Sequence, residues 1–187
     1  MKKPYLKKYG TIADFTIWIV DGAHVRQHMN EEFTNYGQHY RFSFIPKYEF
    51  WIDKEYSGRG EEPYYIDHLL VEYRLMIEGK SFHKALTMAD RIERRERSKS
   101  RILRDRNKRK PRKKLLIQIY KTLLKKYSKR VNVWLVNGEL VRDLLFIDFT
   151  EGGHGYVYPF IPRDEIWIDD DVNPRERKFI LLHELHE

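Results

Sequence analysis

The chain has 187 residues, 41% apolar and 14% aromatic, which excludes a wholly disordered protein because this composition supplies a core. Cysteine is absent, so disulfides, thiolate metal ligands and thiol nucleophiles are excluded. There is no apolar run of about 18 residues, and no apolar stretch follows the lysine-rich N-terminus. We therefore expect a cytoplasmic protein with no signal peptide and no membrane span.

The first part of the chain predicts strands followed by a helix. Phe15–Val20 is rich in β-branched and aromatic residues and ends at Asp-Gly, a turn signal. The elements expected after it are a short helix, a strand of alternating aromatic residues ended by a proline, another strand and a long helix: Val25–Met29, Tyr40–Ile45, Phe50–Asp53 and about Glu62 to Glu78.

The middle of the chain predicts two helices separated by a proline. Phe82–Lys108 is expected to be the first, Pro111 breaks it, and Arg112–Ser128 is expected to be the second. In the second helix, apolar and tyrosine residues such as Leu116 and Ile119 follow helical spacing, so it is expected to pack against another element.

The last part of the chain repeats the order of the first. The expected elements are a strand, a short helix, two strands and a final helix: Val131–Val136, Val141–Phe146, Tyr156–Ile161, Ile166–Asp169 and about Pro174 to the chain end. Asp170, Asp171 and Asn173-Pro174 supply the start signals of the final helix.

Internal similarity supports this order. Shifting the chain by 116 residues aligns Ile17–Asp53 with Val133–Asp169 without a gap. The shared residues include Trp18/Trp134, Gly22/Gly138, Arg26/Arg142, Trp51/Trp167 and Asp53/Asp169. After one deletion the alignment continues through His68/His183 to Glu72/Glu187. The pattern predicts a duplication.

The expected architecture is α+β, with two copies of a strand-strand-strand-helix unit joined by basic helices. The expected boundaries are a first repeat at 11–90, a connector at 91–130 and a second repeat at 131–187. The second repeat stops at the position of Glu72, so we expect it to be truncated. Arg26 with Asp53, and Arg142 with Asp169, are candidates for a repeated structural ion pair.

Positive charge is concentrated in the connector. Residues 91–130 contain 19 Lys or Arg against three acidic residues, although the whole chain carries only +8. Such density favours contact with nucleic-acid phosphates, and a solvent-exposed connector is the alternative. The candidate nucleic-acid-binding residues are Arg94, Arg95, Arg101, Arg104, Lys108, Arg109, Lys110, Arg112, Lys113 and Lys114.

A histidine and a glutamate four residues apart occur in the final helix of both copies. Residues at this spacing share a helix face, so both side chains can reach one ion. His68 and Glu72 form the first pair, and His183 and Glu187 the second. Glu184 replaces Leu69 of the apolar stripe, and a carboxylate in a core-facing position needs a partner.

The run His183-Glu184-Leu185-His186-Glu187 resembles the H-E-x-x-H helix of zincin metallopeptidases. The resemblance implies that His183 is a ligand of zinc or another divalent metal and that Glu184 is the general base. The second histidine of the family's motif falls on Glu187, which departs from the pattern, although zinc also accepts carboxylate.

A catalytic zinc requires a third ligand, and three histidines are candidates. His154 lies in a glycine-rich loop, His186 lies three residues after His183, and His83 follows Glu72 on the next helix of the first copy. Two hypotheses follow. One is a zincin-like metal-dependent hydrolase, perhaps a peptidase, with its site in the second repeat. The other is a non-enzymatic nucleic-acid-binding or scaffold protein whose His–Glu pairs are structural.

Overall fold

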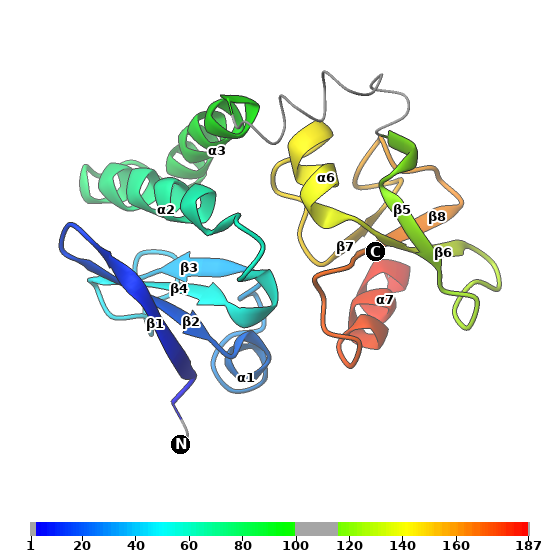
Figure 1. Ribbon diagram of the computed structural model, residues 1–187, viewed down its shortest axis with the longest axis horizontal. Helices are drawn as coiled ribbons and strands as arrows, with labels where there is room; N and C mark the ends of the chain where they lie inside the picture. Colours follow the sequence, from blue (N-terminus) through cyan, green and yellow to red (C-terminus); the bar gives the residue numbers. More distant parts are fainter. Residues whose placement is uncertain (1–2, 100–115, 187) are drawn as a thin grey trace. The chain divides into compact units, whose positions relative to one another are not determined.

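The computed structural model describes residues 3–99 and 116–186. The chain divides into two compact units, Met1–Glu96 and Arg97–Glu187. Within the described ranges, five α-helices and two four-stranded sheets form an α+β fold (Figure 1). None of the described helices is long and apolar enough to cross a membrane.

The first unit is a sheet with helices on both faces. Its elements are β1 (Tyr5–Ile12), β2 (Phe15–Val20), α1 (Gly22–His28), β3 (Tyr36–Gln38), β4 (Glu49–Asp53), α2 (Glu62–Ile77) and α3 (Phe82–Lys99). The strand order is β1-β2-β4-β3, with β2 and β4 parallel and the outer pairs antiparallel. One face packs on α2 through Ile17, Phe50 and Ile52, and the other packs on α1 and the following loops through Val25 and Trp51.

The second unit has the same arrangement of strands. Its elements are β5 (Tyr120–Leu123), β6 (Asn132–Val136), α6 (Gly138–Leu144), β7 (Gly152–His154), β8 (Glu165–Asp169) and α7 (Arg177–His186). The strand order is β5-β6-β8-β7, again with a parallel central pair. The central register is also the same, because Trp18 faces Trp51 and Trp134 faces Trp167.

The prediction of strands at Tyr40–Ile45 and Tyr156–Ile161 is wrong. In the first unit, backbone hydrogen bonds run from Phe42 to Gln38 and from Ile45 to Phe42, which is turn geometry. The strand that pairs with β4 is the short β3 just before this segment. The turn packs onto the sheet, which buries Phe42 and partly buries Phe44, so alternation here does not reflect a pleated strand.

The prediction of a helix at Arg112–Ser128 is wrong from Tyr120 onward. Tyr120–Leu123 is strand β5, the antiparallel edge partner of β6. Tyr120 packs edge-on against Trp134 and Trp167, and its hydroxyl donates to Glu165. These cross-strand contacts override the helical spacing. Part of the predicted 91–130 connector therefore belongs to the second sheet.

Two further elements bear on the predicted boundaries. Strand β1 was not predicted, because most of its side chains are exposed and no apolar face marks it. The first unit therefore begins before residue 11, the predicted boundary. The helix predicted at Phe82–Lys108 is observed from Phe82 to Lys99, and the rest lies outside the described residues.

Candidate metal centre and basic helix

The Arg–Asp ion pair predicted in each repeat is confirmed. Arg26 donates to Asp53 at 2.9 Å, and Arg142 donates to Asp169 at 2.6 Å. Each arginine also donates to the carbonyl oxygen of a phenylalanine, Phe33 or Phe149. Burial outweighs the neighbouring guanidinium and raises the pKa of Asp53 to about 6. The pair links a short helix to the end of a central strand, which is a structural role.

An acidic cluster follows β8. Oxygens of Asp169, Asp170 and Asp171 lie within 4.8 Å of one another, close enough for one metal ion. Basic side chains already occupy this cluster, because Arg142 contacts Asp169 and Asp171 and Lys121 contacts Asp170. From the sequence, Asp170 and Asp171 are expected only as helix start signals, and Asp169 only as the partner of Arg142.

His68 is the centre of a buried polar network in the first unit. Its side chain is 1% exposed, its Nδ1 lies 2.9 Å from Glu93 Oε2 on α3, and its Nε2 lies 3.7 Å from Glu72 Oε2. Gln38, at the end of β3, donates to Glu72 Oε1 at 2.5 Å. Burial lowers the pKa of His68, but Glu72 and Glu93 outweigh it and raise that pKa to about 10. The two carboxylates therefore favour the protonated, positively charged form of the ring at neutral pH.

Sequence reasoning identified His68 and Glu72 but missed Glu93 and Gln38. A signal for Glu93 was present, because Ala85, Ala89 and Glu93 recur at four-residue spacing and all are buried. His83, the third ligand considered for this copy, is exposed at the other side of α3. The structure thus brings Glu93, and not His83, against His68.

In the second unit the structure brings together two of the predicted site residues. Nε2 of His154, on β7, lies 3.9 Å from Oε2 of Glu184, on α7, and both side chains are 8% exposed. The space for Glu184 arises at Gly152, where the first unit has Tyr36. A Cβ on Gly152 would lie 3.4 Å from Glu184 Oε1, so the carboxylate lies where a larger residue would extend. In the first unit, the corresponding place is filled by the Tyr36 ring, which packs on Tyr65 and His68.

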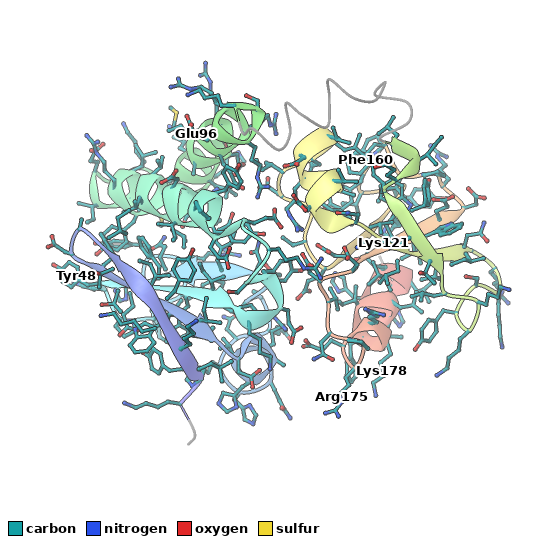
Figure 2. All side chains as sticks on the ribbon, in the orientation of Figure 1. Tyr48, Glu96, Lys121, Phe160, Arg175 and Lys178 are labelled. Atoms are coloured by element: carbon teal, nitrogen blue, oxygen red, sulfur yellow. The ribbon has the colours of Figure 1, made fainter. Side chains whose placement is uncertain are left out.

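Unlike the His154–Glu184 pair, the other candidate ligands on the described part of α7 are not buried. His183 and His186 are exposed, and Glu187 lies outside the described residues. Ile180 and Leu181 are the buried residues of the helix. Figure 2 shows Arg175 and Lys178 where α7 begins.

Helix α3 presents a basic outer face. Its inner side carries Ala85, Ala89 and Glu93, whereas Arg91, Arg94 and Arg95 are exposed. Of the predicted nucleic-acid-binding residues, only Arg94 and Arg95 are described. The others, Arg101, Arg104, Lys108, Arg109, Lys110, Arg112, Lys113 and Lys114, lie outside the described residues.

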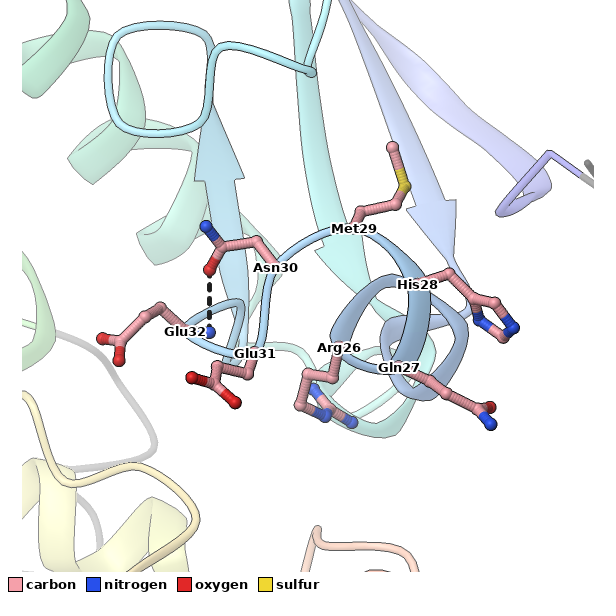
Figure 3. A pocket seen from close by; sticks show the side chains of 7 residues that line it. All are labelled: Arg26, Gln27, His28, Met29, Asn30, Glu31 and Glu32. Atoms are coloured by element: carbon pink, nitrogen blue, oxygen red, sulfur yellow. Dashed lines mark hydrogen bonds between the residues drawn. The ribbon is translucent and has the colours of Figure 1, made fainter.

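A hollow of about 360 Å³ lies at the end of α1 (Figure 3). It is lined by residues 26–32, and Asn30 Oδ1 accepts from the backbone N–H of Glu32 there. Arg26 is engaged with Asp53, and the other walls are exposed polar residues and Met29. The hollow therefore brings none of the predicted site residues together.

Comparison with known proteins supplies no further guide. No protein-family model, curated protein or solved structure matches this chain.

Proposed function

We propose that the second unit is a metal-dependent hydrolase, perhaps a peptidase, that uses zinc or another divalent cation. The observation that carries the proposal is the buried pair of His154 and Glu184 at 3.9 Å. The N–O distance is too long for a hydrogen bond. The pair places a candidate metal ligand, the His154 imidazole, beside the carboxylate of a candidate general base.

We further propose that the two units arose by duplication. Their identical strand orders, their shared tryptophan register and the repeated Arg–Asp ion pair all support it. The aligned residues of the first unit then serve as a guide to the second.

In the first unit, Glu72 contacts both Gln38 and His68. The aligned residues of the second unit are His154, His183 and Glu187, two imidazoles and one carboxylate. This set is a known combination of catalytic zinc ligands. It fits the metal by donor chemistry, because neutral imidazole and carboxylate are ligands that zinc accepts.

Glu184 is then the general base. Zinc held by these ligands would supply Lewis-acid polarisation of a water molecule and of the substrate carbonyl. The Glu184 carboxylate would accept the water proton and deliver it to the leaving group. Its burial beside His154 keeps it oriented within the site.

The first unit is proposed to have no such activity. Leu69 stands where Glu184 stands, so a base is missing, and Gln38 stands where His154 stands. The protonated His68 is held by Glu72 and Glu93 as a structural ion network.

Metal analysis of the full chain, purified without chelator, tests the proposal. We expect about one divalent metal per chain, lost in His183→Ala and His154→Ala. Glu184→Gln should retain the metal and lose hydrolysis of a labelled protein substrate. His186→Ala and His68→Gln are matched histidine controls that should retain the metal. Less than about 0.2 metal per chain after zinc is added would reject the site.

A second function is favoured by the outer face of α3. We propose that this face, together with the basic run that follows it, binds nucleic-acid phosphates without sequence preference. Its inner residues are buried, which leaves Arg94 and Arg95 exposed on the opposite side. Each contacted phosphate of duplex DNA would contribute about −0.9 to the salt slope of the binding constant.

Fluorescence anisotropy with a labelled duplex tests this second function. The triple change Arg94→Glu, Arg95→Glu and Lys99→Glu should weaken binding at least tenfold and flatten the salt slope. The control triple, Lys7→Glu, Lys8→Glu and Lys47→Glu, makes the same charge change at exposed positions away from α3. Equal losses in both triples would contradict a specific role for α3.

A further inference from the structure

A groove lies between the C-terminal half of α2 and the first half of α3, two helices that pack side by side in Figure 1. Its volume is about 500 Å³. A tight turn joins the two helices at Gly79, whose φ of 82° suits glycine, and backbone N–H groups of Gly79 and Lys80 close the end of α2. The turn at one end and the buried His68–Glu93 contact hold α3 beside α2, so the groove is a built feature of the first unit.

The groove has an apolar floor and a cationic rim. Leu75 and Met88 supply apolar surface, and Met88 is 44% exposed. Lys80, Lys84 and Arg91 supply three positive charges around it. Within the part of the chain that the structure describes, none of these three side chains forms an ion pair.

Exposed cations usually lie near carboxylates on a protein surface of mixed charge. Here, three of them surround apolar surface with no acidic lining residue, since the remaining walls are His83 and Thr87. Thr87 donates its hydroxyl hydrogen to the carbonyl oxygen of His83, so the hydroxyl is used within the helix. The groove therefore offers positive charge and apolar contact as its two means of recognition.

We propose that this groove binds a dissolved amphipathic anion, a carboxylate or phosphate group on an apolar chain or ring. The volume lies within the usual range of small-ligand sites, about 300–1,000 Å³. Lys84 and Arg91 would hold the anionic group, and Leu75 and Met88 would contact the apolar body. A nucleic-acid base is a poorer occupant, because the lining contains no Phe, Tyr or Trp ring for stacking.

The proposal is independent of the metal site and of the phosphate contacts assigned to Arg94 and Arg95. Its direct test is fluorescence titration of the full chain with anilinonaphthalene sulfonate, followed by displacement with dodecanoate. We expect saturable binding of one probe per chain. Inorganic phosphate should not displace the probe at the same concentration, because it lacks the apolar body.

Variants separate the two recognition elements. The double change Lys84→Glu and Arg91→Glu should weaken probe binding at least tenfold, and so should Met88→Asp. Their matched controls are Lys7→Glu with Lys8→Glu, and Met29→Asp, which is also an exposed methionine of the first unit. Lys84→Met with Arg91→Met removes the charges without adding repulsion and should also weaken dodecanoate binding if each variant keeps the parental circular dichroism.

Three results would overturn the proposal. Unsaturable binding, or equal losses in groove and control variants, would show adsorption to general surface. Displacement by duplex DNA that depends on Lys84 and Arg91 but not on Met88 would assign the cations to nucleic acid. Binding to anionic phospholipid vesicles with no binding of free dodecanoate would assign them to a membrane surface.

Discussion

Gly22 and Gly138 begin helices α1 and α6, each directly against a buried aspartate. A Cβ added to Gly22 would lie 1.8 Å from Asp53 Oδ2, and one added to Gly138 would lie 2.1 Å from Asp169 Oδ2. The missing side chain allows each carboxylate to reach its arginine beside the helix start. At this position, glycine is needed for close approach and not for an unusual φ.

We therefore expect Gly22→Ala to destabilise the first unit by about 2–4 kcal/mol, because the carboxylate must move from its ion pair. Chemical denaturation monitored by tryptophan fluorescence measures this loss. Gly10→Ala is the control, since nothing lies within 4 Å of a Cβ added there. A loss below about 0.5 kcal/mol for Gly22→Ala would contradict the steric argument.

Arg142 is a second residue whose removal should be costly. Its side chain is 1% exposed and donates to Asp169, Asp171 and the carbonyl oxygen of Phe149. Arg142→Gln leaves buried carboxylates without their cation, so we expect a loss of about 3–5 kcal/mol in the free energy of unfolding. Arg175→Gln, at an exposed position of the same unit, should change it by less than about 0.5 kcal/mol.

At the scale of elements, the contact between α2 and α3 should depend on pH. The ordinary pKa of histidine is 6.5, and Glu72 and Glu93 overcome the effect of burial to raise that of His68 to about 10. A pKa raised in the folded state means that the folded protein holds its proton more tightly than the unfolded chain. The resulting stabilisation is complete below pH 6.5 and is lost as the pH rises towards 10.

We expect the free energy of unfolding of the first unit to fall steadily between about pH 7 and pH 10. His68→Gln should be less stable at pH 7 and show a smaller slope over this range. His28→Gln, which alters an exposed histidine, should retain the parental slope. An unchanged slope in His68→Gln would mean that another group causes the pH dependence.

At the scale of the whole molecule, the first unit contains the groups that stabilise it. Strand β1 supplies Tyr5, which packs edge-on against Trp18 and Trp51 and donates to Glu49. Helix α3 supplies Glu93 to His68. The stabilising contacts of the unit thus extend on both sides of the predicted 11–90 repeat.

A fragment of residues 1–99 should therefore fold with a cooperative thermal transition. The shorter fragment 11–90 lacks most of β1 and Glu93, so it should melt at a markedly lower temperature or remain unfolded. Circular dichroism at increasing temperature distinguishes them. Equal melting temperatures would show that β1 and the end of α3 add nothing to the stability of this unit.

The sequence by itself determined the elements whose signals are local. The β-rich segments before Asp21-Gly22 and Asn137-Gly138 are strands, and the spacing of apolar residues over Glu62–Glu78 marks a helix. The internal repeat also predicted the Arg26–Asp53 and Arg142–Asp169 pairs, because identical residues at aligned positions of two similar units have equivalent neighbours. These features depend on turn chemistry and on periodicity within a single segment.

Only the tertiary structure decided which distant residues meet. Strand β5 forms where Tyr120 packs on Trp134 of β6 and Trp167 of β8, and no helical or strand periodicity within its own segment predicts that contact. His68 meets Glu93 across two helices, and Glu184 meets His154 in the space left by Gly152. Cross-strand hydrogen bonding and the desolvation of buried charges act between residues far apart in the chain, so their outcome is set only when the sheet and helices have packed.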